Sequence, residues 1–273
     1  MLQQLKKVGL FALIMACVLT LAACTGSNSE VSASGNENQV EDLSWSKIEE
    51  KNELVVGLCA AYPPFESRNE ETGDLEGFDI DLATALGQAL ETPVKVEDAE
   101  WQALLGGLNK GDFDVLITCM SKKEAAVENV NMSDVYYNLN DVIVVREGYD
   151  AIQSKDDLKE KTVGVQLGSG SEQIVDKMEG LKEIKRYNYN PEAFIDLKHE
   201  RLDAVVVGYA YAVNHIKKEG GFEVVDTPVE SAEIVMVMRH GEDALTEKVN
   251  EALQAVKENG AYDQAISKWL EVK

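Results

Sequence analysis

The sequence is poor in positive charge, in cysteine and in long apolar runs. It has 26 Lys and Arg against 49 Asp and Glu, which gives a formal net charge of −23 at pH 7. A chain this acidic is a poor partner for nucleic acid or for an anionic lipid surface. After residue 24 no stretch is apolar enough to cross a bilayer. The remaining composition, 45% hydrophobic and 27% charged, is typical of a globular protein with one or two cores.

The one long apolar run lies at the N-terminus. Lys6 and Lys7 precede an uncharged run over residues 8–21, and small residues at 22–23 lead to Cys24. This pattern predicts a signal peptide over residues 1–23. Residues 21–24 (LAAC) resemble a bacterial lipobox, which implies that Cys24 becomes the first mature residue and carries lipid on its sulfur. The alternative is an ordinary signal peptide with a cysteine at that position by chance.

Residues 24–44 are dominated by Gly, Ser, Asn and Glu and contain almost nothing that could build a core. Such a composition predicts a flexible tether. The folded part of the chain is therefore expected to begin near Trp45.

From residue 54 onward, strand and helix patterns alternate. Phe78, Leu82, Leu86 and Leu90 recur every four residues and predict an amphipathic helix. Apolar runs predict strands at 54–57, 94–96 and 114–118, with a helix from about Leu104 to Gly111. This alternation predicts an α/β fold with a parallel-type sheet.

The alternation then starts again. Strands are predicted at 142–145, 162–166, 184–187, 204–207 and 234–238, and helices at 171–178, 191–199, 243–259 and 262–269. Two βαβ assemblies of about 100 residues each fit this length better than one large sheet.

Several motifs stand in the order found in a known family. They are residues 54–57 (LVVG), 62–65 (YPPF), 77–83 (GFDIDLA), Trp101, 111–114 (GDFD), 133–137 (SDVYY), 163–168 (VGVQLG) and 202–207 (LDAVVV). From about Trp45 to Lys273 the chain resembles the family 3, polar amino-acid type, of solute-binding proteins of bacterial ABC importers. The resemblance implies an α/β, two-lobed periplasmic-binding-protein-like (type II) fold with two hinge strands, near residues 141–145 and 233–238.

The same resemblance divides the chain into parts and implies its partners. Lobe 1 is expected at 45–141, lobe 2 at 142–232, and the returning hinge with the C-terminal helices of lobe 1 at 233–273. A small solute is expected between the lobes, at the carboxyl ends of the strands. The partners expected are an ABC permease and, through lipid on Cys24, the extracytoplasmic face of the cell membrane. A monomer without cofactor, metal or nucleic acid is expected.

The charged groups by which relatives recognise α-amino acids are missing. Counting without gaps, the arginine that pairs with the carboxylate falls on Ala126, and the two aspartates that hold the ammonium fall on Cys59 and Gly208. Burying the charges of a zwitterion without such partners is costly. The cargo is therefore expected to be an aromatic, alkylammonium or other non-standard solute. Binding of an amino acid through Ser169, Ser171 and Lys122 is the alternative.

The remaining site residues are aromatic, small or sulfur-bearing. Tyr62 and Trp101 match positions at which relatives stack an aromatic ring on the ligand, while Tyr211 is expected in a core. The loop at 169–171 begins a helix and either holds an anion or serves only as an N-cap. The candidate ligand-binding residues are Cys59, Tyr62, Trp101, Thr118, Cys119, Met120, Ser121, Lys122, Ser169, Gly170, Ser171, Gly208 and Tyr209.

Cys59 and Cys119 each end a predicted lobe 1 strand. A disulfide, free thiols that contact a ligand or metal, and small apolar fillers are the three interpretations, with the first and last favoured over a metal. Catalysis of a dehydratase type is a remote alternative, because only Lys122, Lys123 and Glu124 offer acid–base chemistry in the cleft segment. A sensor domain is a third function class, which the absence of a later membrane span or effector domain disfavours.

Overall fold

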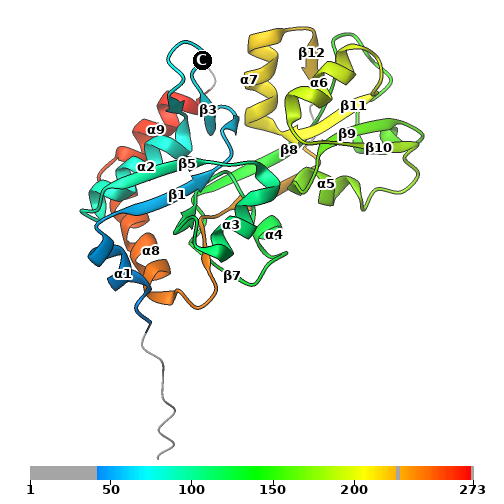
Figure 1. Ribbon diagram of the computed structural model, residues 1–273. Helices are drawn as coiled ribbons and strands as arrows, with labels where there is room; N and C mark the ends of the chain where they lie inside the picture. Colours follow the sequence, from blue (N-terminus) through cyan, green and yellow to red (C-terminus); the bar gives the residue numbers. More distant parts are fainter. Residues whose placement is uncertain (1–41, 226–227, 272–273) are drawn as a thin grey trace, which may run out of the picture. The chain divides into compact units, whose positions relative to one another are not determined.

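The computed structural model describes residues 42–225 and 228–271 of the chain (Figure 1). The predicted signal peptide, Cys24 and nearly all of the predicted tether lie outside the described residues. The first element is helix α1 (Ser44–Lys51), so Ser44, the last residue of the predicted tether, already belongs to a helix. No helix within 42–225 or 228–271 has the length and apolar character needed to span a bilayer.

The first sheet mixes parallel and antiparallel pairs. Its strand order is β5 (Val94–Asp98), β1 (Leu54–Leu58), β6 (Val115–Leu116), β14 (Val237–Arg239) and β7 (Val130–Met132). Strand β1 runs parallel to both β5 and β6, while β14 is antiparallel to β6 and β7. Because side chains alternate along a strand, Leu54 and Val56 enter one core and Val55 enters another. The sheet is therefore buried on both faces.

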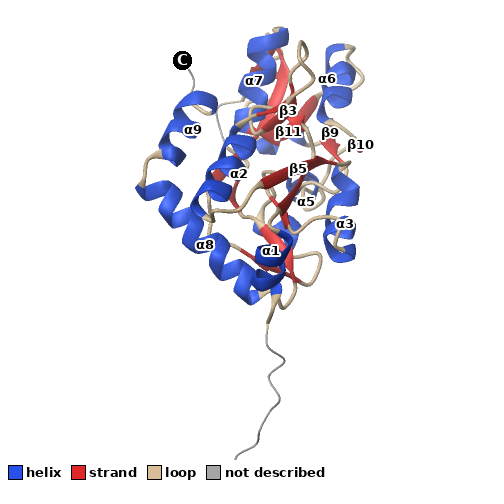
Figure 2. Ribbon diagram, turned by 60° about the vertical axis from the view of Figure 1, so that its left-hand side comes forward, coloured by secondary structure: helices blue, strands red, loops and turns tan. Residues whose placement is uncertain are grey.

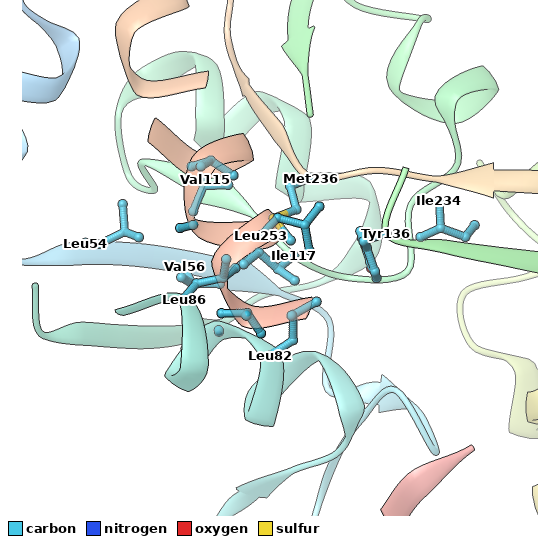
Figure 3. Packing of buried hydrophobic residues seen from close by; sticks show 14 of the residues in the cluster. Leu54, Val56, Leu82, Leu86, Val115, Ile117, Tyr136, Ile234, Met236 and Leu253 are labelled. Carbon is cyan, nitrogen blue, oxygen red and sulfur yellow. The ribbon is translucent and has the colours of Figure 1, made fainter. Parts of the chain in front are cut away.

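Helices from distant parts of the chain cover this sheet. Figure 2 shows α2 (Phe78–Ala89), α8 (Asp243–Glu258) and α9 (Ala261–Trp269) on one side and α3 (Leu104–Lys110) on the other. In the larger core, Leu82 and Leu86 of α2 meet Val56 of β1 and Leu253 of α8 (Figure 3). The C-terminal helices thus complete the lobe that the first strands begin.

The second sheet has the strand order β10-β9-β11-β8-β12, with β13 also paired to β8. The strands are β10 (Glu183–Tyr187), β9 (Thr162–Gln166), β11 (Ala204–Gly208), β8 (Tyr137–Arg146), β12 (Phe222–Val224) and β13 (Glu230–Ile234). Helices α5 (Gly170–Val175), α6 (Asn190–Lys198) and α7 (Tyr209–Glu219) pack against it. Two further cores, one on each face, make this the second lobe.

Shorter elements belong to both lobes, and only η2 packs in the second lobe, through Leu158. Strands β2 (Ala61–Tyr62), β3 (Glu66–Arg68) and β4 (Leu75–Glu76) form a small antiparallel sheet. The single turns are η1 (Trp101–Ala103), α4 (Lys122–Ala125) and η2 (Lys155–Leu158).

The chain crosses between the lobes along two adjacent segments. The first joins β7 to β8 and the second joins β13 to β14. Backbone hydrogen bonds link them: Ser133 N–H donates to Met236 O (2.9 Å) and Tyr136 N–H donates to Ile234 O (3.0 Å). The two-lobed α/β fold with two connecting strands is the one expected.

Three details of the second half differ from the sequence expectation. The strand predicted at 234–238 is two strands, because Val235 and Met236 lie at the crossing where the chain leaves one sheet for the other. Helix α7 was not predicted, although Tyr211 and Ala212 face the second-lobe core and the His215 ring stacks on Tyr211 one turn later. Residues 141–145, expected at the first hinge, lie within β8, where 141–144 pair with β11 and 145 pairs with β12.

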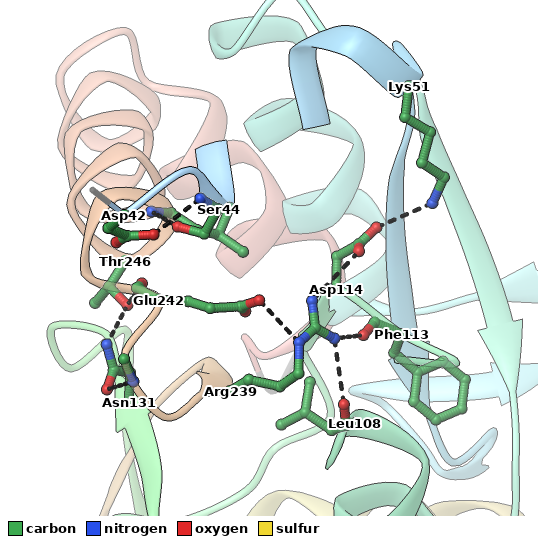
Figure 4. A network of polar contacts seen from close by, with 12 residues as sticks. Asp42, Ser44, Lys51, Leu108, Phe113, Asp114, Asn131, Arg239, Glu242 and Thr246 are labelled. Atoms are coloured by element: carbon green, nitrogen blue, oxygen red, sulfur yellow. Dashed lines mark hydrogen bonds and ion pairs between the residues drawn. The ribbon is translucent and has the colours of Figure 1, made fainter. Parts of the chain in front are cut away.

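A network of polar contacts surrounds Arg239, the last residue of β14, in lobe 1 (Figure 4). The Arg239 guanidinium donates to the carbonyls of Leu108 (3.2 Å) and Phe113 and to Glu242 (2.8 Å). Asp114 accepts from the backbone N–H of Val55 at 2.8 Å. These bonds satisfy carbonyls at the end of α3 and fix β14 beside β6.

Candidate ligand-binding site

A cavity lies between the two sheets, where strands β1, β6, β9 and β11 end. It is lined by Cys59, Ala61, Tyr62, Glu66, Trp101, Thr118, Cys119, Ser121, Glu124, Leu139, Asp141, Gln166, Ser169, Gly170, Ser171, Asn190, Val207, Ala232 and Ile234. Open α/β sheets usually bind ligands at this edge. Both lobes, including the strands β8 and β13 that lead into the crossing segments, therefore contribute to one site.

Nine of the thirteen candidate residues line this cavity. They are Cys59, Tyr62, Trp101, Thr118, Cys119, Ser121, Ser169, Gly170 and Ser171. Met120, Lys122, Gly208 and Tyr209 do not. Ala126, the position matched to the family arginine, is exposed at the end of α4 and is also outside the lining.

Each of the four residues outside the cavity has a visible reason to be there. Met120 is 2% exposed and packs in the lobe 1 core on the α3 side. Lys122 pairs with Glu233 at 3.0 Å on the surface. Tyr209 is 44% exposed at the start of α7, and Gly208 is separated from the cavity by the Tyr62 hydroxyl.

Tyr62 and Gly208 make a direct contact between the lobes. The Gly208 N–H donates to the Tyr62 hydroxyl at 3.2 Å. A Cβ added at Gly208 would meet that hydroxyl and would lie 2.6 Å from Leu139 Cδ2. The Tyr62 ring also stacks on Tyr211, with centroids 4.9 Å apart. A glycine at position 208 therefore allows the Tyr62 hydroxyl to approach the second lobe this closely. Tyr211, which is buried in the second-lobe core, also covers one face of the Tyr62 ring.

The lobes touch again on the far side of the cavity. Trp101 Nε1–H donates to Gly168 O (3.1 Å) and Gln102 Nε2–H donates to Leu167 O (3.3 Å). The enclosed cavity measures about 50 Å³, which holds no more than a few water-sized molecules. A larger open groove of about 1240 Å³ adjoins it at Cys59 and Ala61. A solute the size of an amino acid therefore requires the lobes to move apart.

Glu124 is held by backbone groups from both lobes. Its Oε2 accepts from Ser121 N–H (2.7 Å) and its Oε1 accepts from Gly170 N–H (2.5 Å). The Ser121 hydroxyl accepts from Glu124 N–H in return, which completes a capping box on α4. Burial raises the pKa of Glu124 to about 7, although these hydrogen bonds favour the charged form.

Asp141 is a second buried carboxylate, on strand β8. It is 5% exposed and accepts a hydrogen bond from the Ser171 hydroxyl. Burial raises the pKa of Asp141 to about 6, while the Ser171 hydrogen bond and the charge of Lys123 act in the opposite direction. Two acidic groups therefore face the cavity from opposite lobes.

Glu66, which lines the cavity, and Asp79, which does not, form a buried acidic pair. Glu66 Oε1 accepts from the Thr118 hydroxyl (3.0 Å), and Asp79 Oδ2 accepts from Cys119 N–H (2.7 Å). Their other oxygens, Glu66 Oε2 and Asp79 Oδ1, receive no donor from the rest of the described chain. Burial and the neighbouring Asp79 raise the pKa of Glu66 well above its usual range, so a proton on Glu66 donated to Asp79 satisfies both oxygens.

The described residues that line the cavity include no lysine, arginine or histidine. Lys122 and Lys123, the lysines nearest in sequence, pair with Glu233 and Glu230 of β13. The cavity thus combines two buried carboxylates, a protonated acidic pair and the aromatic rings of Tyr62 and Trp101. Such a lining suits a cation, through ion pairing and through the faces of aromatic rings.

Both described cysteines are free and buried. Burial raises the pKa of the Cys59 thiol to about 11 and that of Cys119 well above its ordinary value. The two thiols therefore stay protonated near neutral pH and act as small apolar wall groups. Within the described part of the chain no three His, Cys, Asp or Glu side chains are placed to hold a metal ion.

Three acidic lining residues were absent from the sequence-derived set: Glu66, Glu124 and Asp141. The capping-box spacing of Ser121 and Glu124 was a usable signal for a buried, fixed Glu124. Asp141 directly precedes an apolar strand run, and such a carboxylate is a candidate for burial. Glu66 carries no such signal, because its burial depends on contacts with Asp79 and Thr118 that are distant in sequence.

Comparison with known proteins agrees with this geometry. The model of the bacterial extracellular solute-binding proteins, family 3, matches residues 54–272. The arginine-binding extracellular protein ArtP of Bacillus subtilis (strain 168) is 32% identical over 268 residues, covering 96% of this chain and 97% of ArtP.

Solved structures give the same result. An ancestral arginine-binding protein bound to arginine is 38% identical with a TM-score of 0.75, covering 81% of this chain and 99% of that one. The ancestral amino acid-binding protein AncCDT-1, a precursor of cyclohexadienyl dehydratase, is 32% identical with a TM-score of 0.76, covering 83% of this chain and 99% of that one. The chain therefore belongs to the bacterial extracellular solute-binding proteins, family 3.

Proposed function

We propose that this protein is a lipid-anchored receptor that binds a small cationic solute, of the alkylammonium or guanidinium type, and presents it to an ABC permease. The observation that carries the proposal is the sign of the buried charge: Glu124 and Asp141 face the cavity, and the described lining has no basic side chain. A cation satisfies both carboxylates, whereas an anion meets like charge.

The relatives support a cationic cargo. ArtP and the ancestral structure are named for binding arginine, whose side chain is a guanidinium. Trp101 and Tyr62 line the cavity and supply aromatic rings for contact with such a group.

Closure of the lobes is the proposed signal to the permease. The contacts Trp101–Gly168 and Tyr62–Gly208 join the lobes when they are together. A cation between Glu124 and Asp141 adds attraction that exists only in the closed form, and a ligand shifts a conformational equilibrium by that difference.

The cargo proposal is tested with the purified domain that begins near residue 42 and a panel of solutes of each charge type. The panel holds putrescine, cadaverine, agmatine, choline, arginine, lysine, glutamine, glutamate, cystine and uracil. A solute that binds the native state raises the melting temperature by mass action. We expect stabilisation by cations and none by glutamate or uracil. Stabilisation by neutral or anionic members alone would refute a cationic cargo.

The anchor proposal rests on the lipobox-like residues 21–24. Labelling cells with a palmitate analogue should mark the wild-type protein and leave the Cys24→Ala variant unlabelled. The variant should also leave the membrane fraction. Equal labelling of both proteins would refute lipidation at Cys24.

A dehydratase-type activity on this scaffold is the remote second candidate, and AncCDT-1 is the relative that favours it. Incubation of the protein with cyclohexadienyl compounds, followed by product analysis, tests it. Turnover lost in Glu124→Gln would support an enzyme, and absence of turnover would leave the binding role.

A further inference from the structure

Glu124 occupies an unusual position between the lobes. It belongs to the first lobe through α4, yet one of its oxygens accepts the Gly170 N–H at the start of α5 in the second lobe. The residue is buried at this junction, with 8% of its surface exposed. In the capping box the Glu124 side chain has only to accept the Ser121 N–H, through Oε2, so its second hydrogen bond, accepted from the Gly170 N–H, is an addition that the cap does not explain.

The neighbouring donors are also occupied by protein acceptors. The Ser171 hydroxyl donates to Asp141, and the Ser169 hydroxyl donates to Gln166 O (2.7 Å). A carboxylate on the cargo that approached this wall would have to displace Glu124 from Gly170. It would then lie beside the acidic side chains of Glu124 and Asp141 in a buried site.

We propose that Glu124 is a specificity-determining residue. It makes the cleft bind a cation that lacks a carboxylate more tightly than the α-amino acid that carries the same cationic side chain. The inference rests on the proposed cationic cargo and goes beyond it, because arginine is itself a cation. Glu124 supplies the carboxylate that closes this wall, so the cargo carries none there.

The proposal separates two kinds of cation that share every other feature. Agmatine is arginine without its carboxylate, and cadaverine is lysine without its carboxylate. Each pair keeps the charged end that faces Asp141 and the aromatic rings, and differs only in the group that Glu124 excludes.

The experiment measures the dissociation constants of both pairs by calorimetry at about pH 8, for the wild type and for Glu124→Ala, Glu124→Asp and Glu233→Gln. In the wild type, we expect the amine to bind at least about tenfold more tightly than its amino acid. Glu124→Ala should reduce that preference by at least about tenfold, chiefly by improving binding of the amino acid.

The other two variants separate specificity from structure. Glu124→Asp keeps the charge but is shorter by one methylene, so it cannot reach Ser121 and Gly170 together, and it should lose part of the preference. Glu233→Gln removes an exposed charge that pairs with Lys122 on the adjacent strand, and it should keep the wild-type preference. Melting curves report whether each variant is folded.

The outcomes distinguish the two proposals. If the wild type binds agmatine and arginine equally well, or if folded Glu124→Ala and Glu124→Asp both keep the preference for the amine, Glu124 is a structural residue only and a cationic cargo still stands. If the wild type binds none of the four cations, the cationic cargo is refuted and the role of Glu124 with it.

Discussion

Cation binding by the cleft is expected to weaken steeply as the pH falls. Burial raises the pKa of Glu124 from 4.5 to about 7 and that of Asp141 from 3.8 to about 6. Both groups are therefore charged at about pH 8 and mostly protonated at about pH 5. A cation needs the charged forms.

The direction of the effect follows from proton linkage. A bound cation favours the carboxylates and lowers both pKa values relative to the free cleft. Binding then releases the protons that the free cleft holds. Cation affinity is therefore highest above about pH 7, and it falls as Glu124 takes up a proton near pH 7 and Asp141 near pH 6. If the bound state holds neither proton, the two groups reduce affinity by ~10³-fold between about pH 8 and about pH 5. Proton uptake by the Glu66–Asp79 pair also removes negative charge near the cavity, and so weakens cation binding further as the pH falls.

Calorimetric titration with agmatine measures this dependence, because its amine and guanidinium stay protonated over the whole range. Repeating each titration in two buffers of different ionisation enthalpy counts the protons released. Glu124→Gln should keep only the Asp141 part, ~10-fold over the same range. Glu233→Gln, which removes an exposed charge, should keep the full dependence. Affinity that is constant over this range, or tighter in acid, would refute the reasoning.

Three further predictions concern single side chains. Trp101→Ala removes the bond to Gly168 O and a ring face of the cavity, so cation affinity should fall at least about tenfold by calorimetry; unchanged affinity would exclude a role for this side chain. Gly208→Ala pushes a methyl group against the Tyr62 hydroxyl and should make closure of the lobes less favourable by about 1–3 kcal/mol. Ligand binding should weaken, and X-ray scattering with ligand should give a larger radius of gyration than for the wild type. A variant that closes like the wild type would contradict the contact. Arg239→Met leaves the carbonyl of Phe113 without its donor and removes one of the two donors to Leu108 O, which keeps the Gly111 N–H. The change should lower the free energy of unfolding by about 2 kcal/mol in urea, with cation affinity unchanged because none of these residues lines the cavity. A change in affinity with no loss of stability would show that the network serves the site.

The fold was largely predictable because its signals are local. The four-residue recurrence from Phe78 predicted helix α2, and the apolar run at 204–207 predicted β11. The crossing at Val235 and Met236 was not predictable in this way, because an apolar extended segment has the same pattern whether it stays in one sheet or passes to another.

The site was predictable only in part, because its charges depend on contacts across the sequence. Small and aromatic positions at strand ends, such as Cys59 and Trp101, follow from the order of the motifs. The family arginine position gave no information about what replaces it: Ala126 is exposed, whereas the carboxylate of Glu124, two residues earlier, turns into the cavity. That orientation requires Gly170 from the other lobe, which no local pattern contains.

The buried charges of the free cleft also indicate the sign of its cargo on energetic grounds. Burial raises the pKa of both Glu124 and Asp141, which means that ionising each group in the closed, empty cleft costs on the order of a few kcal/mol more than in water. Neutral or anionic cargo leaves that cost in place, or adds to it. A cation offsets it, and the offset exists only while the lobes enclose both carboxylates, so the same charges that oppose closure of the empty cleft at neutral pH favour closure on a cation. No basic side chain of the described residues lines the cavity, so a cationic solute supplies the positive charge that faces Glu124 and Asp141. The attraction between the solute and these carboxylates favours the closed form of the lobes.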